Sequence, residues 1–332
     1  MCPSSTRRLG FTLIELVVSL VLIATIAVVI WSIYLRPGQL ERRNSRNCMA
    51  NLKQFGQSLQ MYASEQPEGL YPPMKTTHCD GTTIAGWSGV LDFELLVPAY
   101  LPGLDTVAMC PGDDSGHSAL EMWDGGENES VHWQAAHMEE RLNKTSNGML
   151  EPCEVYGQSY TYTGWALPET FFSMTYTTPE WKPVTTSKTP GAAEVFRANV
   201  VLQGTALAKS GEKAAKADWV FDTQGQPDIF RGSTRAPRLG TGVERKLVKD
   251  PQDSRALESQ RAQVAVMWDS WSTQSWPSGT TSIAIFLHAP GGGNVLYLDG
   301  HVEFVKYTGG GSPFPYDDCG KFLQQAMHEL YE

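Results

Sequence analysis

The sequence begins with an apolar segment that constrains how the whole chain can be used. Residues 11–35 carry a single formal charge, on Glu15, and as an α-helix they are long enough to cross a bilayer. A carboxylate within such a helix is costly unless it has a partner, so Glu15 is predicted to be functional. A secretory signal peptide is normally cut after its apolar core. Here the expected cut lies before that core, between Gly10 and Phe11.

Residues 10–29, GFTLIELVVSLVLIATIAVV, resemble the processing motif of type IV pilins and type II secretion pseudopilins. In that family a prepilin peptidase cuts after the glycine, the new N-terminal residue is methylated, and a glutamate at mature position five is kept for assembly. The matching residues are Gly10, Phe11 and Glu15. The resemblance implies that Glu15 of one subunit pairs with the Phe11 amine of a neighbour, because an unpaired buried carboxylate is costly. An uncleaved membrane anchor with an incidental Glu15 is the alternative.

The resemblance also divides the chain into a leader, a two-part helix and a head. It implies a leader of residues 1–10, a transmembrane or filament-core helix of residues 11–35, a head-proximal helix of residues 36–66 and a β-rich head of residues 67–332. The second helix has a signal of its own, since apolar residues recur along it at intervals of three or four. This stripe is expected to pack under a sheet and consists of Cys48, Leu52, Phe55, Leu59 and Tyr62.

Charge and cysteine content limit the head further. The net charge is −10, and removing the leader takes away two arginines and no acid, which makes it −12. Such acidity argues against nucleic-acid binding, which needs a basic surface. Cys2 leaves with the leader, and the odd number of remaining cysteines predicts up to two disulfides and one free thiol. The lack of any CxxC spacing argues against a zinc site. The disulfide candidates in the head are Cys79, Cys110, Cys153 and Cys319.

Several short segments of the head resemble landmarks of one pilin-like subfamily. Asp113 and Asp114, in the first of them, could bind calcium, but aspartate and glycine favour turns for local reasons, so a solvated turn is the preferred interpretation. The second and third landmarks read as strands. The segments are CPGDDS at residues 110–115, SYTYTG at 159–164 and VMWD at 266–269.

Residues 168–236 differ from these landmarks, because proline, threonine, lysine and glycine are scattered through them. They are expected to form a large irregular insertion in the head. Short strand-like runs are expected within it at residues 195–196 and 219–221.

The C-terminal part of the sequence predicts a β-hairpin at residues 294–307. Apolar and β-branched residues lead into Asp299-Gly300, the pair that a two-residue type I′ turn prefers, and polar and apolar residues alternate after it. His288 precedes this pair by ten intervening residues. The arrangement resembles a motif of a histidine, nine residues and Asp-Gly that marks a large group of prepilin-processed proteins, here with one residue more.

A structural calcium ion is the cofactor that the sequence raises, although none is required. Pseudopilins often hold calcium in the C-terminal head, so the resemblance suggests that His288, Asp269 and Asp299 converge on such an ion. Carboxylate oxygens suit calcium, but histidine does not. The preferred interpretation is that His288 satisfies loop backbone groups and that Asp299 stabilises the turn.

We predict an α+β fold in which a long N-terminal helix packs on an antiparallel β-sheet. The predicted function is structural and not enzymatic: a subunit of a pseudopilus or of a type IV pilus-like filament, with the type of machine left open. The implied partners are the prepilin peptidase, other pilin-like subunits, an inner-membrane assembly platform and membrane lipid, with no nucleic acid. The implied location is the inner membrane, crossed once with the N-terminus inside and the head extracytoplasmic, and then the filament.

The alternative is a ligand-binding or enzymatic domain that is tethered to the membrane and exported by the same route. The sequence contains no HExxH, GxSxG or Walker motif. A ligand-binding tip subunit stays open, because Trp268, Trp271 and Trp276 are close enough in sequence to form an exposed aromatic patch. Core packing is the preferred explanation for most of the tryptophans.

Overall fold

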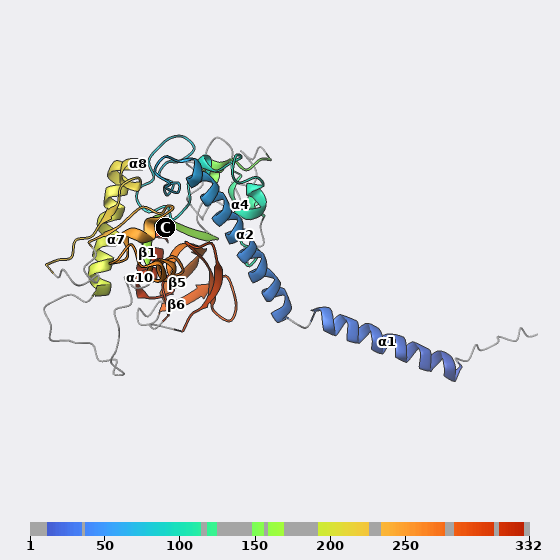
Figure 1. Cartoon of the computed structure of the whole chain (residues 1–332). Helices are drawn as coiled ribbons and strands as arrows, with labels where there is room; N and C mark the ends of the chain where they lie inside the picture. The colour runs from blue at the N-terminus through green and yellow to red at the C-terminus, as the bar shows by residue number, and fades with distance from the viewer. Residues whose placement is uncertain are drawn as a thin grey trace, which may run out of the picture. The chain divides into compact units, whose positions relative to one another are not determined.

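The computed structural model describes most of the chain as two compact units, Met1–Arg43 and Asn44–Glu332. Figure 1 shows the elements of each unit. Gly10, Phe11, Asp114 and Trp276 lie outside the described residues. The described ranges are 12–34, 37–113, 118–124, 148–155, 159–168, 192–225, 234–275, 282–308 and 312–328.

The first unit contains helix α1, Leu13–Tyr34, and the start of helix α2, Pro37–Glu65. The two helices are separate because proline tolerates only the first turn of a helix, where its missing N–H is not needed. The residue before a proline is also disfavoured in the helical conformation. Pro37 is therefore the first residue of α2, and α1 ends before it.

Within the head, one face of α2 forms the centre of the hydrophobic core. Cys48, Leu52, Phe55 and Leu59 are each 0% exposed, as the three- and four-residue spacing predicts. Tyr62 continues the stripe and is partly buried, with its ring 5.6 Å from that of Tyr100. The opposite face of α2 is exposed to solvent.

Beneath α2 lies an antiparallel sheet of four strands, which confirms the predicted α+β fold. The strand order is β1-β4-β7-β8, and every neighbouring pair is antiparallel. Helix α2 contacts two of the strands: the Phe55 ring lies 5.4 Å from Tyr160, and a Cβ at Gly56 would meet the Leu296 side chain at 3.0 Å. The strands are β1 (Tyr160–Pro168), β4 (Val264–Asp269), β7 (Gly292–Tyr297) and β8 (Val302–Lys306).

The other face of the sheet is covered by helix α10, Asp318–His328. Thr161, which points away from α2 because side chains alternate along a strand, donates a hydrogen bond to Gln324 Oε1 at 3.3 Å. Leu323 and Met327 of α10 are buried. Every residue of the central strands β4 and β7 is also buried, as expected for strands covered on both faces.

Part of the expected irregular insertion packs in the core, and the prediction of a strand at residues 195–196 is wrong. Residues 195–196 lie in helix α7, Ala192–Ser210, where Phe196 is 0% exposed. Trp219 begins strand β2 (Trp219–Val220), as expected, and its ring lies 5.9 Å from that of Trp165. Both tryptophans also contact Trp87. Tertiary packing of the aromatic rings therefore orders a segment whose composition alone suggested a loop.

The remaining described elements are short and surround this core. Helix α9 begins at an N-cap, Asp253, whose carboxylate accepts from the backbone N–H groups of Arg255 and Ala256. These elements are η1 (Phe93–Leu95), α3 (Leu104–Val107), α4 (Ala119–Trp123), η4 (Pro152–Glu154), α8 (Glu212–Ala215), β3 (Arg235–Ala236), η5 (Val243–Lys246), α9 (Ser254–Arg261), β5 (Trp271–Ser275) and β6 (Ser282–Phe286).

Two of the three tryptophans considered for a binding patch are in the core. Trp268 is 1% exposed and packs edge-on against Phe314, with ring centroids 5.4 Å apart. Trp271 is 4% exposed and stacks on Phe286 at 5.4 Å. The interpretation in which Trp268 and Trp271 belong to an exposed aromatic patch is therefore wrong.

The C-terminal hairpin is present, but its turn differs from the predicted type. Leu296 pairs with Val302, and the Gly300 N–H donates to Tyr297 O at 2.9 Å, so the loop has three residues, 298–300. A type I′ turn needs a positive φ at both central residues, and Asp299 does not have one. Gly300, with φ 88°, supplies the single left-handed residue that closes a three-residue loop.

Candidate functional site

Helix α1 begins with reciprocal hydrogen bonds between Thr12 and Glu15. The Thr12 backbone N–H and hydroxyl both donate to Glu15 Oε2, at 3.0 and 2.9 Å, and the Glu15 N–H donates to Thr12 Oγ1 at 3.3 Å. This is the capping box of a Thr-x-x-Glu sequence, which satisfies N–H groups that the first helical turn leaves unpaired. Glu15 therefore stabilises the helix start within one chain. Both donors use Oε2, so Oε1 can accept from another group.

The rest of α1 presents apolar side chains on all sides. Every described side chain from residue 12 to residue 29 is exposed, and the large apolar ones are between 50% and 80% exposed. The Ser19 and Thr25 hydroxyls donate back to Glu15 O and Leu22 O, so their polar atoms are satisfied inside the helix. A helix that is apolar on all sides is stable when other apolar groups surround it. Lipid and neighbouring helices both meet that need.

The head contains a second constellation, centred on the buried carboxylate of Asp269 at the end of β4. Asp269 Oδ2 accepts hydrogen bonds from the Asn294 backbone N–H and from Asn294 Nδ2, both at 2.7 Å. His288 Nε2 lies 3.2 Å from the same oxygen. The three residues are 0–1% exposed. Asn294 in turn accepts from the Ser45 hydroxyl at 3.3 Å, which connects the cluster to α2.

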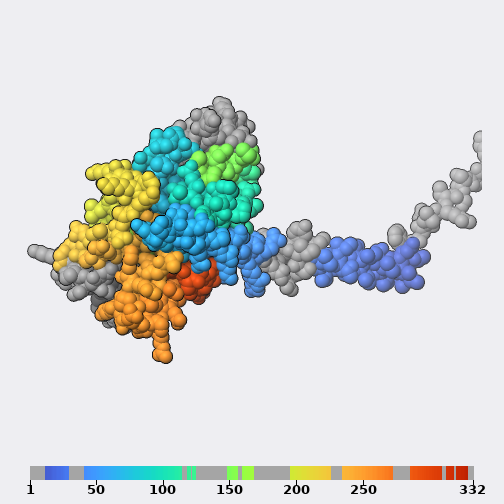
Figure 2. Space-filling model, turned by 45° about the horizontal axis from the view of Figure 1, so that its top comes forward, coloured from blue at the N-terminus to red at the C-terminus, as the bar shows by residue number. Residues whose placement is uncertain are grey.

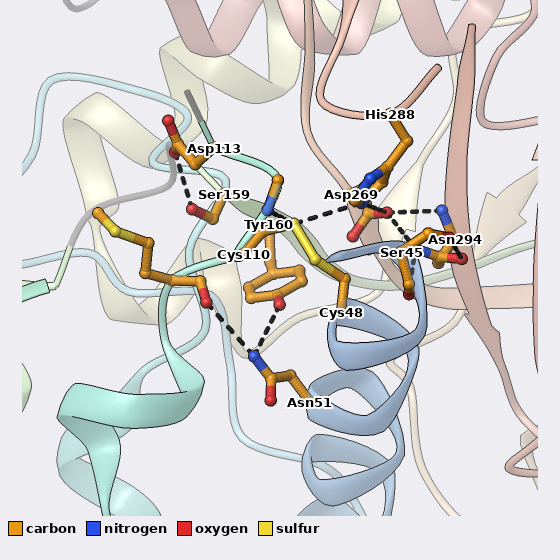
Figure 3. Close-up of a disulfide and its surroundings, with 12 residues drawn as sticks. Ser45, Cys48, Asn51, Cys110, Asp113, Ser159, Tyr160, Asp269, His288 and Asn294 are labelled. Atoms are coloured by element: carbon orange, nitrogen blue, oxygen red, sulfur yellow. Dashed lines mark hydrogen bonds and ion pairs between the residues drawn. A yellow bond between two sulfur atoms is a disulfide. The ribbon is translucent and has the colours of Figure 1, made fainter. Parts of the chain in front are cut away.

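A disulfide lies directly beside this cluster (Figure 3). Cys48 of α2 is bonded to Cys110, and His288 Nε2 lies 3.3 Å from Cys110 Sγ. The nearby Asn51 side chain donates to Tyr160 OH at 3.1 Å. Burial, with the charge of Asp269 as a smaller cause, raises the pKa of Tyr160 well above its ordinary value. The polar groups of the site are therefore buried and are arranged by hydrogen bonds.

Two glycines permit this close packing. A Cβ at Gly112 would lie 2.5 Å from His288 Cε1, and a Cβ at Gly293 would lie 2.0 Å from Tyr316 OH and 2.9 Å from Asp269 Cβ. The Tyr316 hydroxyl donates to the Asp269 backbone oxygen at 3.1 Å. The glycine at position 293, near the start of β7, thus serves close packing against Asp269.

The structure places the predicted disulfide candidates as follows. Cys79 pairs with Cys153, and Cys110 pairs with Cys48, a residue that the sequence assigned to the helical stripe. Cys319 is buried and belongs to neither bridge. Cys48 serves both roles, because a residue on the core-facing stripe of α2 also faces the turn that carries Cys110.

The predicted calcium candidates do not come together. Asp269 lies beside His288, as considered, but Asp299 is at the exposed hairpin turn, where its Oδ1 accepts from the His301 N–H at 3.0 Å. Asp299 therefore serves the turn. Asp113 accepts from the Ser159 hydroxyl at 3.0 Å, and Asp114 lies outside the described residues. Convergence of His288, Asp269 and Asp299 on one ion is wrong.

Among the described residues, two groups bring at least three potential metal ligands within 4.8 Å of one another. One is Cys48, Cys110, Asp269 and His288, all buried. The other is Asp124, Glu151 and Glu154, whose carboxylates are used locally. Asp124 Oδ2 accepts from the Gly148 N–H at 2.8 Å, and Glu154 Oε2 accepts from the Glu151 N–H at 2.9 Å.

A separate cavity of about 380 Å³ opens where α2 meets the segment that follows β3. Figure 2 shows the surface of α2, in blue, beside that of the segment after β3, in orange. Two charged residues that line the cavity already form an ion pair, because Arg261 Nη2 lies 2.5 Å from Glu244 Oε1. That carboxylate also raises the pKa of Arg261. Other lining residues are Gln60, Tyr71, Thr241, Leu298 and Asp299.

Sequence reasoning missed Thr12, Asn294 and the pairing of Cys48 with Cys110. Thr12 had a readable signal, since Thr-x-x-Glu before an apolar run is the signature of a capping box. Asn294 and the pairing of Cys48 with Cys110 had none, because their partners are far apart in the chain.

Residues 5–31 match the model of a family described as the prokaryotic N-terminal methylation motif. The match covers most of the apolar segment and excludes the head, and it supports a type IV pilin-like protein. Such proteins are structural subunits that a prepilin peptidase processes. No curated protein and no solved structure matches the chain. In the part of the chain that the structure describes, no helix is both long and apolar enough to cross a membrane.

Proposed function

We propose that the chain is a structural subunit of a pseudopilus or a type IV pilus-like filament, processed between Gly10 and Phe11. Before assembly the segment of residues 11–35 anchors the subunit in the inner membrane, with the head extracytoplasmic. Its partners are the prepilin peptidase, the assembly platform and other pilin-like subunits.

The observation that carries the proposal is the exposed apolar surface of α1, interrupted by one carboxylate and coincident with the methylation-motif match. Single soluble chains rarely expose an apolar surface of this extent, and such a surface marks an interaction site. In a filament, each α1 exchanges lipid contacts for contacts with other α1 helices.

Glu15 sets the register of this packing. Cleavage after Gly10 creates an α-amino cation at Phe11. The Glu15 carboxylate, with Oε1 not used by Thr12, accepts from the amine of a neighbouring subunit. Removing one partner of a buried ion pair leaves the other charge uncompensated, which costs about 3–5 kcal/mol.

The experiment has two parts. Mass spectrometry of the purified protein identifies the N-terminus, and we expect peptides that begin at methylated Phe11. Filaments sheared from cells are then quantified for the wild type, Glu15→Ala, Glu15→Gln and Ser19→Ala. Glutamine keeps the capping-box hydrogen bond but removes the charge, so both Glu15 variants should lose at least about tenfold in filament yield.

Ser19→Ala is the matched control, because it removes a polar group one turn further along α1 and should leave the yield unchanged. Wild-type yield from both Glu15 variants would show that the residue is incidental and would favour a plain anchor. Wild-type yield from Glu15→Gln alone would assign Glu15 to helix capping. Intact peptides spanning Gly10–Phe11 would contradict processing.

A further inference from the structure

We propose that the reduced chain binds a transition metal ion of the zinc class through Cys48, Cys110, His288 and Asp269. The disulfide and the metal are then mutually exclusive, because both use the sulfurs of Cys48 and Cys110. The site is independent of filament assembly, since all four ligands belong to the head.

The donor atoms already have the required proximity. One ligand atom from each of the four residues lies within 4.8 Å of all the others, and the residues are at most 1% exposed. The sulfurs are 2.05 Å apart in the disulfide. Two thiolates on a tetrahedral zinc ion lie about 3.8 Å apart, given Zn–S distances of ~2.3 Å. Reduction removes the S–S bond, and the sulfurs then separate by the distance that the ion needs.

The donor chemistry selects the class of metal. Thiolate, imidazole and carboxylate are all ligands of tetrahedral zinc, whereas calcium and magnesium require oxygen ligands. The site therefore differs from the calcium site considered from the sequence. The proposed zinc-class site has no CxxC pattern in the sequence, because its ligands come from α2, the 110–113 turn, the end of β4 and the loop before β7.

One buried atom points independently to a ligand. Asp269 Oδ1 has no hydrogen-bond partner among the described residues, although Asp269 is 1% exposed. A buried carboxylate oxygen without a partner is costly, and a bound cation satisfies it. The other oxygen, Oδ2, is held by both Asn294 donors, which fixes the orientation of the carboxylate. Outer hydrogen bonds of this kind orient the ligands of metal sites.

The scaffold that presents the ligands has support besides the disulfide. Cys48 belongs to the buried stripe of α2, and Ser45 bonds to Asn294 through both its hydroxyl and its backbone oxygen. The Asp113 N–H donates to Cys110 O at 2.8 Å, which closes the turn that carries Cys110. His288 is held in the loop that pairs with Gly292. Figure 3 shows His288 and Asp269 beside the disulfide that joins Cys48 of α2 to Cys110.

The atom balance is simple, because the newly synthesised chain already carries thiols. A divalent ion binds two thiols and releases two protons, and no electrons are transferred. Oxidation by a disulfide-forming oxidant removes two electrons and two protons from the thiols, forms the S–S bond and excludes the ion.

The test uses the full chain in detergent on a Cys2→Ser background. The protein is unfolded with a phosphine reductant, refolded without oxygen in the presence of Co²⁺, and separated from free metal. We expect one cobalt per chain, with the visible bands of a tetrahedral site and a thiolate-to-cobalt charge-transfer band. With Zn²⁺ in place of Co²⁺, mass spectrometry after alkylation should show Cys48 and Cys110 protected and Cys79, Cys153 and Cys319 modified.

Matched variants locate the site. Cys79→Ser/Cys153→Ser should bind one cobalt with an unchanged spectrum, and Cys48→Ser/Cys110→Ser should lose it. His288→Gln should weaken Co²⁺ binding by at least the roughly 10–100-fold that removing an outer hydrogen-bond partner costs. The alkylation pattern of the wild-type thiols decides the matter if a variant fails to fold. Substoichiometric cobalt in the refolded wild type, protection of Cys79 and Cys153 instead, or a reduced wild type that cannot refold with metal would each overturn the proposal.

Discussion

The two disulfides of the head form a matched pair that separates the effect of chain entropy from the effect of burial. Cys48–Cys110 closes a loop with a sequence separation of 62, and Cys79–Cys153 one of 74. The loop-closure relation gives about 4 kcal/mol of stabilisation for each at room temperature, since the cost grows only with the logarithm of loop length. On entropy alone, removing either bridge should therefore destabilise the head equally.

The two disulfides differ in how deeply they are buried, so their removal should not cost the same free energy of unfolding. Cys48 and Cys110 are 0% and 1% exposed, whereas Cys79 and Cys153 are only partly buried. Replacing the first pair by alanine also leaves a cavity in the core, which adds roughly 1–2 kcal/mol. We expect Cys48→Ala/Cys110→Ala to lower the free energy of unfolding by about 5–6 kcal/mol, and Cys79→Ala/Cys153→Ala to lower it by about 4 kcal/mol.

The assay is urea unfolding of the full chain in detergent with a chelator present, followed by tryptophan fluorescence. Both variants should show a larger m-value than the wild type, because the unfolded chain expands when a cross-link is lost. A loss below about 1 kcal/mol in both variants would refute the loop-closure reasoning. A greater loss from the Cys79–Cys153 pair would refute the ranking by burial.

Two further predictions concern the head. Burial, aided by Glu94, raises the pKa of Asp92 to about 6, so the folded state binds the carboxyl proton more tightly than the unfolded state does. The stabilisation that comes from this protonation is complete below about pH 4 and is lost as the pH rises through 6. Asp92→Asn should therefore raise the free energy of unfolding at pH 8 by up to about 3 kcal/mol and leave it unchanged at pH 4; urea midpoints that shift equally at both pH values would contradict this. Leu59→Ala, at a side chain that is 0% exposed, should cost about 2–5 kcal/mol, whereas Met61→Ala, 48% exposed on the opposite face of α2, should change stability by less than about 0.5 kcal/mol. Equal thermal shifts for these two variants would show that the stripe does not form the core.

Features that depend on neighbours in the sequence could be predicted from the sequence alone. The apolar run with Glu15 and the stripe on α2 follow from spacing, because helix geometry places residues three and four apart on one face. Strands β1 and β4 and the hairpin also had local signals. The hairpin turn was mispredicted because Asp-Gly suits both a two-residue loop and the end of a three-residue loop. Cross-strand register decided between the two, with Leu296 opposite Val302.

Only the tertiary structure decided which distant residues meet. Cys110 and His288 are separated by 178 positions, and Ser45 and Asn294 by 249, so no local pattern records their contacts. The packing of α7 has the same origin, since Phe196 of α7 contacts the Trp219 ring and the Trp87 indole N–H donates to Val200 O at 2.8 Å, although the composition of this segment suggested a loop. Burial of apolar area acts on the folded surface as a whole and is not confined to neighbours in sequence. The sequence alone therefore determined the apolar N-terminal helix and its charged residue, and packing determined the buried constellation of the head.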